Sequence, residues 1–117
     1  MTDLLRVNSF DITSTVLSKE ECGLIINIQD QWEDSSLSVN FNIDEKEQPY
    51  KHLCELQSSK EEFTLSLSIH DKKGNKVFGY TFFNCKVGDI FIGTFDRYNT
   101  SPIVGWCAIN YTNSVKT

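Results

Sequence analysis

The chain lacks the long apolar runs by which membrane and secreted proteins are recognised. No window of its 117 residues approaches the ~20 consecutive apolar residues of a membrane helix. Its first ten residues, MTDLLRVNSF, have neither a basic start nor an apolar run long enough for a secretory signal. We therefore expect a protein without a membrane anchor that stays in the cytosol of the cell that makes it.

Cysteine and histidine are too scarce and too scattered to suggest a metal site. The sequence has four cysteines and two histidines, without a CxxC pair: Cys22, Cys54, Cys85, Cys107, His52 and His70. Structural zinc sites need closely spaced ligand pairs, so we expect no bound metal. Because cysteine packs as a small apolar residue, buried free thiols are the plain interpretation.

Catalytic motifs are also missing. The sequence contains no GxSxG, HExxH, glycine-rich phosphate loop or EF-hand pattern, and neither histidine has a Ser or Cys partner at a suggestive spacing. Three clustered carboxylates, Asp44, Glu45 and Glu47, are expected in the first turn of a helix, where the helix dipole favours them. We predict no catalytic residue, no cofactor and no enzymatic activity.

Basic residues are in the minority, with 11 Lys and Arg against 16 Asp and Glu, for a net charge of -5. Nucleic acids and anionic membranes attract positive charge, so this balance disfavours both as bound partners. If the protein meets DNA, we expect it to do so without holding it.

Strict alternation is the clearest pattern that the sequence does contain. In SSLSVNFNID, the residues Leu37, Val39, Phe41 and Ile43 alternate with Ser and Asn, as an antiparallel strand with one buried face requires. The polar face of this strand carries no charge. The segment EFTLSLSIHD, residues 62–71, alternates in the same way.

Further strands and one helix complete the expected fold. The strand candidates are residues 6–12, 23–29 and 102–112, a turn is expected at 71–76, and residues 74–99 read as two strands joined at 86–89. An amphipathic helix is predicted at about 47–58, with Pro49 near its start and Tyr50, Leu53 and Cys54 on its apolar face. The sequence thus predicts one domain, 1–117, mainly β, as a β-sandwich or partly open antiparallel barrel with one short helix packed on it.

One predicted strand has too many large apolar residues. Phe78, Tyr80 and Phe82 fall on one face, while Val77 and Phe83 fall on the other. A strand with one face in water should not be apolar on both. We therefore expect something outside the subunit core to cover its second face.

The order of these elements resembles the tail-tube protein family of contractile-tailed bacteriophages and related injection machines, over roughly residues 24–114. The residues that carry the resemblance follow the family's spacing: Trp32 with Leu37 and Val39; Asp71 with Gly74; Phe83, Asn84, Cys85, Asp89 and Ile90; and Ile109 with Tyr111. The chain departs from the family in reading KVGD where a proline is usual, and in a shorter N-terminal half. A minimal tube protein, a tube-initiating or terminating homologue, and another use of the fold in a virion all remain open.

The resemblance implies a structural virion protein of the tail, assembled in the host cytoplasm. Members form stacked hexameric rings that contact other tail or baseplate proteins and line a channel through which DNA passes without specific binding. The implied subunit-contact residues are Phe78, Tyr80, Phe82, Tyr98 and Trp106. Acidic candidates for the channel wall, where they would repel phosphate, are Asp30, Glu33, Asp34, Asp89 and Asp96.

A second hypothesis belongs to another class of protein. A monomeric β-sandwich of phage or bacterial origin could bind a protein partner through Trp32, Tyr98 and Trp106, since Trp and Tyr often anchor interfaces. Such a module needs one exposed aromatic patch, whereas a ring needs two complementary edges that differ from each other.

Overall fold

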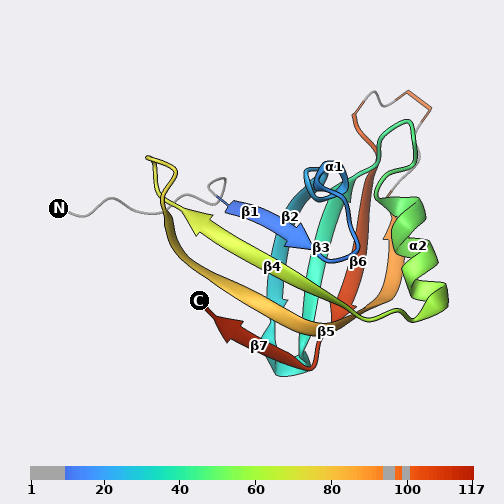
Figure 1. Cartoon of the computed structure of the whole chain (residues 1–117). Helices are drawn as coiled ribbons and strands as arrows, with labels where there is room; N and C mark the ends of the chain where they lie inside the picture. The colour runs from blue at the N-terminus through green and yellow to red at the C-terminus, as the bar shows by residue number, and fades with distance from the viewer. Residues whose placement is uncertain (1–9, 94–96, 99–100) are drawn as a thin grey trace.

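The computed structural model describes residues 10–93, 97–98 and 101–117. Its elements in chain order are β1 (Phe10–Ser14), α1 (Lys19–Cys22), β2 (Ile25–Gln31), the 3-10 turn η1 (Trp32–Asp34), β3 (Ser36–Asn42), α2 (Tyr50–Ser59), β4 (Phe63–His70), β5 (Lys76–Ile92), β6 (Val104–Asn110) and β7 (Asn113–Lys116). The expected mainly β fold with one main helix is confirmed (Figure 1).

The strands form one antiparallel sheet that folds over on itself. Its order is β1-β4-β5-β6-β3-β2, with β7 also paired to β5. The 17-residue strand β5 belongs to both halves, because its first part pairs with β4 and β7 and its second part pairs with β6. We call β1, β4, β7 and residues 76–85 of β5 the arm half-sheet. We call β2, β3, β6 and residues 86–92 the wall half-sheet; Figure 1 shows the first crossing over the second.

The predicted break at residues 86–89 is wrong, because β5 runs through it. The register moves from Val87 opposite Ile109 to Ile90 opposite Cys107, which leaves a β-bulge in between. Glycine suits this bulge, since a Cβ on Gly88 would lie 3.1 Å from the side-chain nitrogen of Asn110. Gly and Asp mark bulges as well as turns, so the letters KVGD alone could not separate the two.

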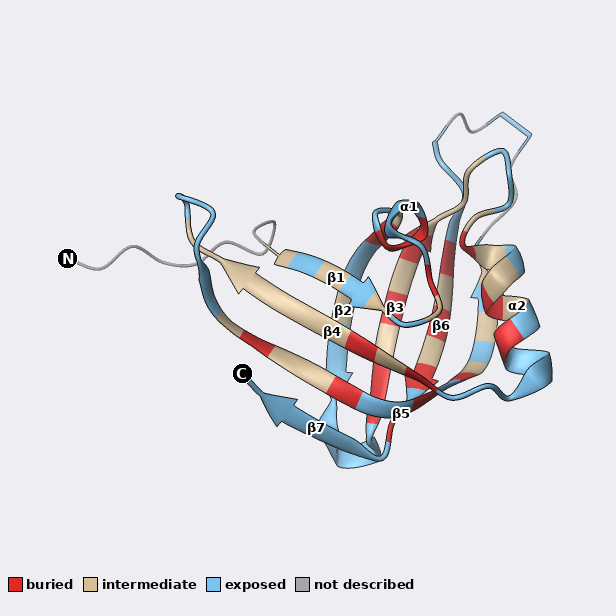
Figure 2. Cartoon of the chain, in the orientation of Figure 1, coloured by how far each residue is buried: buried red, intermediate tan, exposed pale blue. Residues whose placement is uncertain are grey.

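The core lies between the two half-sheets and under α2, as the red bands in Figure 2 show. The alternation predicted for residues 37–41 is confirmed, because Leu37, Val39 and Phe41 are 0%, 1% and 0% exposed. Leu65 and Phe82 face them from the arm half-sheet, also within the core. Burial of such side chains stabilises the fold by roughly 1.5–3 kcal/mol each.

The helix α2 begins at Tyr50, later than predicted, and ends at Ser59. Leu53 and Leu56 point into the core and are each 2% exposed. The three expected first-turn carboxylates instead precede the helix, in a turn. There Asp44 Oδ1 accepts hydrogen bonds from the backbone N–H groups of Lys46 at 3.0 Å and Gln48 at 2.8 Å. Their placement is thus set by a side-chain turn rather than by the helix dipole.

Three short elements were not anticipated: α1, η1 and β7. The start of α1 does have a sequence signal, because Ser18 and Glu21 form a capping box in which each side chain accepts a hydrogen bond from the other's backbone N–H. The first predicted strand, residues 6–12, begins outside the described residues and is seen as β1 at Phe10–Ser14.

The thiols behave as the sequence indicates. Cys22, Cys85 and Cys107 are free and buried, while Cys54 is free and half-buried on α2. Burial raises the pKa of Cys85 to about 11 and that of Cys107 to about 12. These two thiols therefore stay protonated at neutral pH and serve as packing residues.

Candidate subunit-contact surfaces

The outward face of the wall half-sheet is polar but nearly free of charge. Strand register places these residues on it from β2, β3 and β6: Asn27, Gln29, Gln31, Ser36, Ser38, Asn40, Asn42, Val104, Trp106, Ala108 and Asn110. None of these described positions is charged. Strand β5 adds Phe91 opposite Trp106, together with Lys86 and Asp89 near its bulge. This face is the uncharged side of the alternating pattern seen in the sequence.

Side chains on this face hold one another. Asn40 donates a hydrogen bond from Nδ2 to Asn27 Oδ1 at 2.8 Å, and the indole N–H of Trp106 donates to the Ser38 hydroxyl. The Phe91 and Trp106 rings stack with centroids 5.4 Å apart. Side chains that bind each other in this way restrict one another's rotation.

The wall half-sheet has two outer strands, β2 and the second part of β5. Among the described residues no further strand pairs with either of them. On β5, one backbone group is occupied, because Gln57 Nε2 donates to the carbonyl of Gly88 at 2.7 Å. Both sides also expose apolar side chains, with Ile26 at 44% and Phe91 at 59%. Unpaired strand edges of this kind are templates for another chain.

The directions of these two outer strands suit a ring. Each of the four strands is antiparallel to its neighbour, so β2 and the second part of β5 run in opposite directions. Copies related by rotation about an axis along the strands therefore bring β2 of one copy beside β5 of the next in antiparallel orientation. An odd number of strands would give parallel pairing instead.

The aromatic row on β5 starts at the surface and ends in the core. Phe78 and Tyr80 are half-buried, with ring centroids 6.1 Å apart, and Tyr80 stacks on Phe82 at 6.2 Å. Phe82 is 1% exposed and packs on Tyr111, so it is a core residue and not a subunit contact. The expected contact set is corrected at this position, because burial inside one copy already covers its ring.

The arm half-sheet has a second face, on the side away from Phe78, Tyr80 and Phe82, and this face is exposed, as the sequence pattern indicates. Val77 is 52%, Phe83 37% and Val115 44% exposed. No described part of the chain covers these side chains. A single apolar residue at the surface is ordinary, but neighbouring ones on adjacent strands mark a contact surface.

The aromatic residues proposed for a monomeric binding module do not form one patch. Trp32, 72% exposed, lies in η1, which precedes β3. Tyr98, 90% exposed, lies in the segment before β6, at the end of the sheet where Asn42 pairs with Val104. Seven residues of β3 separate these ends, roughly 23 Å at ~3.3 Å per residue. Trp106 lies between them on the outward face.

The acidic channel candidates are likewise dispersed. Asp30 occupies a position paired with the core residue Leu37, and its Oδ1 accepts a hydrogen bond from Tyr111 Oη at 2.7 Å. Burial, together with this hydrogen bond to a carboxylate, raises the pKa of Tyr111 to about 12. Glu33 and Asp34 are exposed in η1. Asp89 is exposed within the bulge of β5, where the register assigns it no partner, and Asp96 lies outside the described residues.

Other kinds of site find little support in the described part of the chain. Residues 10–93, 97–98 and 101–117 contain no group of three or more His, Cys, Asp or Glu side chains that could hold a metal ion. The helices within these ranges are all too short or too polar to span a membrane.

The comparisons with known proteins concern the fold. The sequence matches no family model and no curated protein. The structure matches a chain of the anti-feeding prophage tube-terminating cap, with a TM-score of 0.70 and 7% identity over 100% of this chain and 93% of that one. A chain of the PVC extracellular contractile injection system, in its sheath/tube terminator, gives a TM-score of 0.70 and 8% identity over 99% and 98%.

A third match is Hcp1 from Salmonella typhimurium, with a TM-score of 0.63 and 12% identity over 92% of this chain and 84% of Hcp1. Such low identities show shared architecture and nothing finer. The chain therefore has the tail-tube-like fold of these contractile injection system structures, which confirms the remote resemblance indicated by its sequence.

Proposed function

We propose that this protein is a non-catalytic structural subunit that closes into a ring and stacks as part of the tube, or the tube end, of a contractile tail or injection machine. The observation that carries this proposal is the wall half-sheet, whose two outer strands run in opposite directions on a fold shared with tube and cap structures. A hexamer is the ring size that the family resemblance implies.

Ring closure follows from the two unlike edges. A heterologous contact joins β2 of one copy to β5 of the next and generates a ring when the rotation closes. The joined wall half-sheets then form one large antiparallel barrel with no open edge left. In such a barrel the outward face of each wall half-sheet lines the channel, and α2 lies outside.

The channel wall proposed here is neutral rather than acidic. The outward positions of β2, β3 and β6 are uncharged, and β5 supplies both Lys86 and Asp89. Of the five acidic candidates, Asp89 is exposed in the bulge of β5 next to this face, and the other described ones are not on it by register. A wall without a lysine cluster offers DNA phosphates no salt-dependent partner, so a polymer of either sign slides along it. Passage of DNA without specific binding is part of the proposal.

The test is assembly, measured by native mass spectrometry and negative-stain imaging of the same sample. Ile26→Lys places a charge on the β2 side and should raise the concentration needed for ring formation. Thr13→Lys is the matched control, because Thr13 is exposed on β1, an outer strand of the other half-sheet. A wild type that stays monomeric at every concentration contradicts the ring and favours the monomeric binding module. Equal effects of both variants contradict the choice of β2.

A further inference from the structure

One part of the arm half-sheet extends beyond the rest of the molecule. We call residues 67–80, the end of β4, its turn and the start of β5, the hairpin arm. In Figure 1 its tip is at the left end of the molecule, beyond β2, and α2 is at the right end. The molecule is elongated, with principal extents of 48, 34 and 26 Å.

The tip of the hairpin arm is a well-held basic turn. Asp71 Oδ1 accepts hydrogen bonds from the backbone N–H groups of Lys73 and Asn75, each at 2.9 Å, and Gly74 takes a φ of +87°. This frame uses backbone groups and displays Lys72 and Lys73 as exposed side chains. Residues 71–76 carry a net charge of +2, in a chain whose net charge is -5.

The opposite end of the molecule is acidic and hollowed. Residues 44–62, which contain α2, have six carboxylates against three lysines, a net charge of -3, and one of the carboxylates, Glu62, pairs with Lys86 at 3.4 Å. The outer side of α2 forms an open hollow of about 690 Å³ lined by Tyr50, Cys54 and Glu55, among others. Tyr50 and Cys54 are half-buried, and their side chains interact. This surface, from Glu47 to Ser59, is called the α2 face below.

The proposed ring brings these two ends together. Joining β2 of one copy to β5 of the next places the β2 side of each copy beside the α2 side of its neighbour, because α2 contacts β5. The hairpin arm projects past the β2 side and therefore extends toward the neighbour's α2 face. The half-buried rings of Phe78 and Tyr80 lie along the arm behind its basic tip.

We propose that the hairpin arm of one copy docks on the α2 face of the next copy, a contact that rests on the ring proposed above. Lys72 and Lys73 face the acidic segment, and the half-buried rings of Phe78 and Tyr80 meet the hollow beside Tyr50 and Cys54. Opposite charges at the two ends of one chain also set the direction of assembly, since a tip facing another tip is repelled. The occupant of the α2 face is thus a second copy of this chain.

A charge swap tests the contact. Lys72→Glu with Lys73→Glu, and separately Glu47→Lys with Glu55→Lys, the two carboxylates that line the hollow, should each raise the ring-forming concentration by about tenfold or more at low salt. Combining all four substitutions should restore assembly to near the wild-type level. Lys51→Glu is the control, because it changes the net charge of the chain as much as Lys73→Glu does. It makes the α2 face more acidic and should therefore not weaken assembly. Thermal melting establishes that each variant is folded.

The outcomes separate this contact from the ring itself. A monomeric wild type overturns both proposals. Wild-type rings with lysine variants that assemble equally well, or a four-residue variant that fails to recover, overturn the docking and leave the ring intact. Variants that form normal rings but lose binding to another tail protein would assign the α2 face to that protein, and the docking would again be wrong. Salt screens attraction between opposite charges, so added salt should weaken assembly of the wild type as the charge reversals do. Wild-type assembly that does not change with salt counts against a charge-based contact.

Discussion

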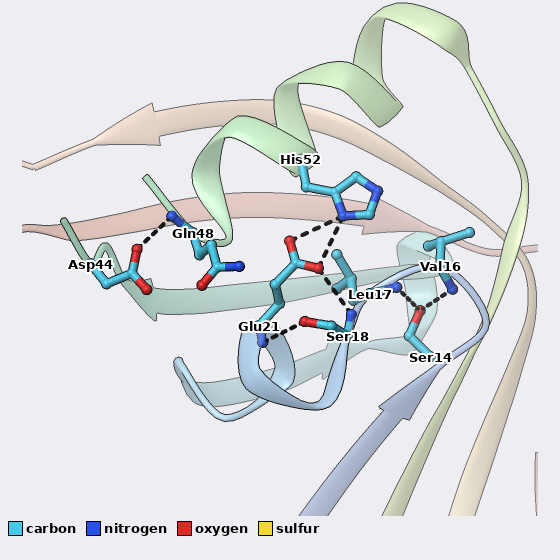
Figure 3. A network of polar contacts seen from close by, with 8 residues as sticks. All are labelled: Ser14, Val16, Leu17, Ser18, Glu21, Asp44, Gln48 and His52. Carbon is cyan, nitrogen blue, oxygen red and sulfur yellow. Dashed lines mark hydrogen bonds and ion pairs between the residues drawn. The ribbon is translucent and has the colours of Figure 1, made fainter. Parts of the chain in front are cut away.

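Glu21 and His52 join the two helices. The Glu21 carboxylate accepts a hydrogen bond from His52 Nδ1, which lies 3.1 and 3.0 Å from its two oxygens (Figure 3). The same carboxylate accepts the backbone N–H of Ser18 at 2.9 Å. Burial opposes the charge of Glu21, but the hydrogen bonds from Ser18 and His52 outweigh it and hold the pKa of Glu21 below its usual value. Both hydrogen bonds are stronger to the ionised carboxylate than to the neutral acid, so they favour the charged form.

This pair predicts a stability loss in acid. A carboxyl group whose pKa is lower in the folded state contributes stability that is present above the unfolded pKa, about 4.3 for Glu. That contribution is lost as the pH falls through the lower, folded pKa. The free energy of unfolding, measured by urea titration from pH 7 to pH 3, should fall more steeply for wild type than for Glu21→Gln. Parallel curves would mean that Glu21 does not contribute.

The packing of α2 gives a second prediction. Leu53 is 2% exposed in the core, so Leu53→Ala removes buried methyl groups and leaves a cavity. We expect a loss of about 2–4 kcal/mol in the free energy of unfolding. Glu55→Ala, at an exposed position on the same helix, is the control and should change stability by about 0.5 kcal/mol or less. An unmoved melting midpoint for Leu53→Ala would place α2 outside the cooperative core.

A close approach between β6 and β3 gives a third prediction. A Cβ on Gly105 would lie 2.4 Å from a ring carbon of Phe41, which is 0% exposed. Gly105→Ala should therefore destabilise the fold by about 1–3 kcal/mol through overpacking. Adding Phe41→Leu should recover part of that loss, because the shorter side chain vacates the overlapped volume. A double variant whose losses simply add would show that the two sites do not interact.

The sequence predicts the wall strands better than the arm, for a physical reason. One face of β3 is buried and the other is polar, so Leu37, Val39 and Phe41 produce a period-two pattern that leaves its register unambiguous. On β5 the same periodicity groups Phe78, Tyr80 and Phe82 together. The periodicity does not show at which point along β5 the wall half-sheet stops covering these three rings. Only the folded chain separates the core residue Phe82 from its half-buried neighbours.

Other features were missed because their signals are local or ambiguous. Gly88 and Asp89 look like a turn, yet the pairing of β6 carries β5 through them as a bulge. Ser114 and Val115 belong to β7, a strand too short and polar for alternation to show. Ile26 and Phe91 were not chosen as contact residues, although the charge-free face of β3 was a usable signal that its surroundings differ from an ordinary solvated surface.

Thiol reactivity gives a prediction for the unassembled chain. Cys22, Cys85 and Cys107 are buried, and burial raises the pKa of all three. Because the thiolate is the reactive form, a thiol reagent at neutral pH should label one cysteine per folded chain and all four after denaturation. The labelled residue should be Cys54, identified by mass spectrometry of peptides. Rapid labelling of Cys107 in the folded chain would contradict the structure.

Assembly should change the reactivity of Cys54 alone. Cys54 lines the hollow on the α2 face, so a neighbour's hairpin arm that docks there must cover it. We expect the labelling rate of Cys54 to fall as the wild type is concentrated into rings, and to stay fast in Lys72→Glu/Lys73→Glu at the same concentration. Denatured samples give equal rates for both chains and serve as the reference for intrinsic reactivity. If rings form and Cys54 reacts as fast within them as in the monomer, the arm contacts something other than the α2 face, and the ring is held by its strand edges without it.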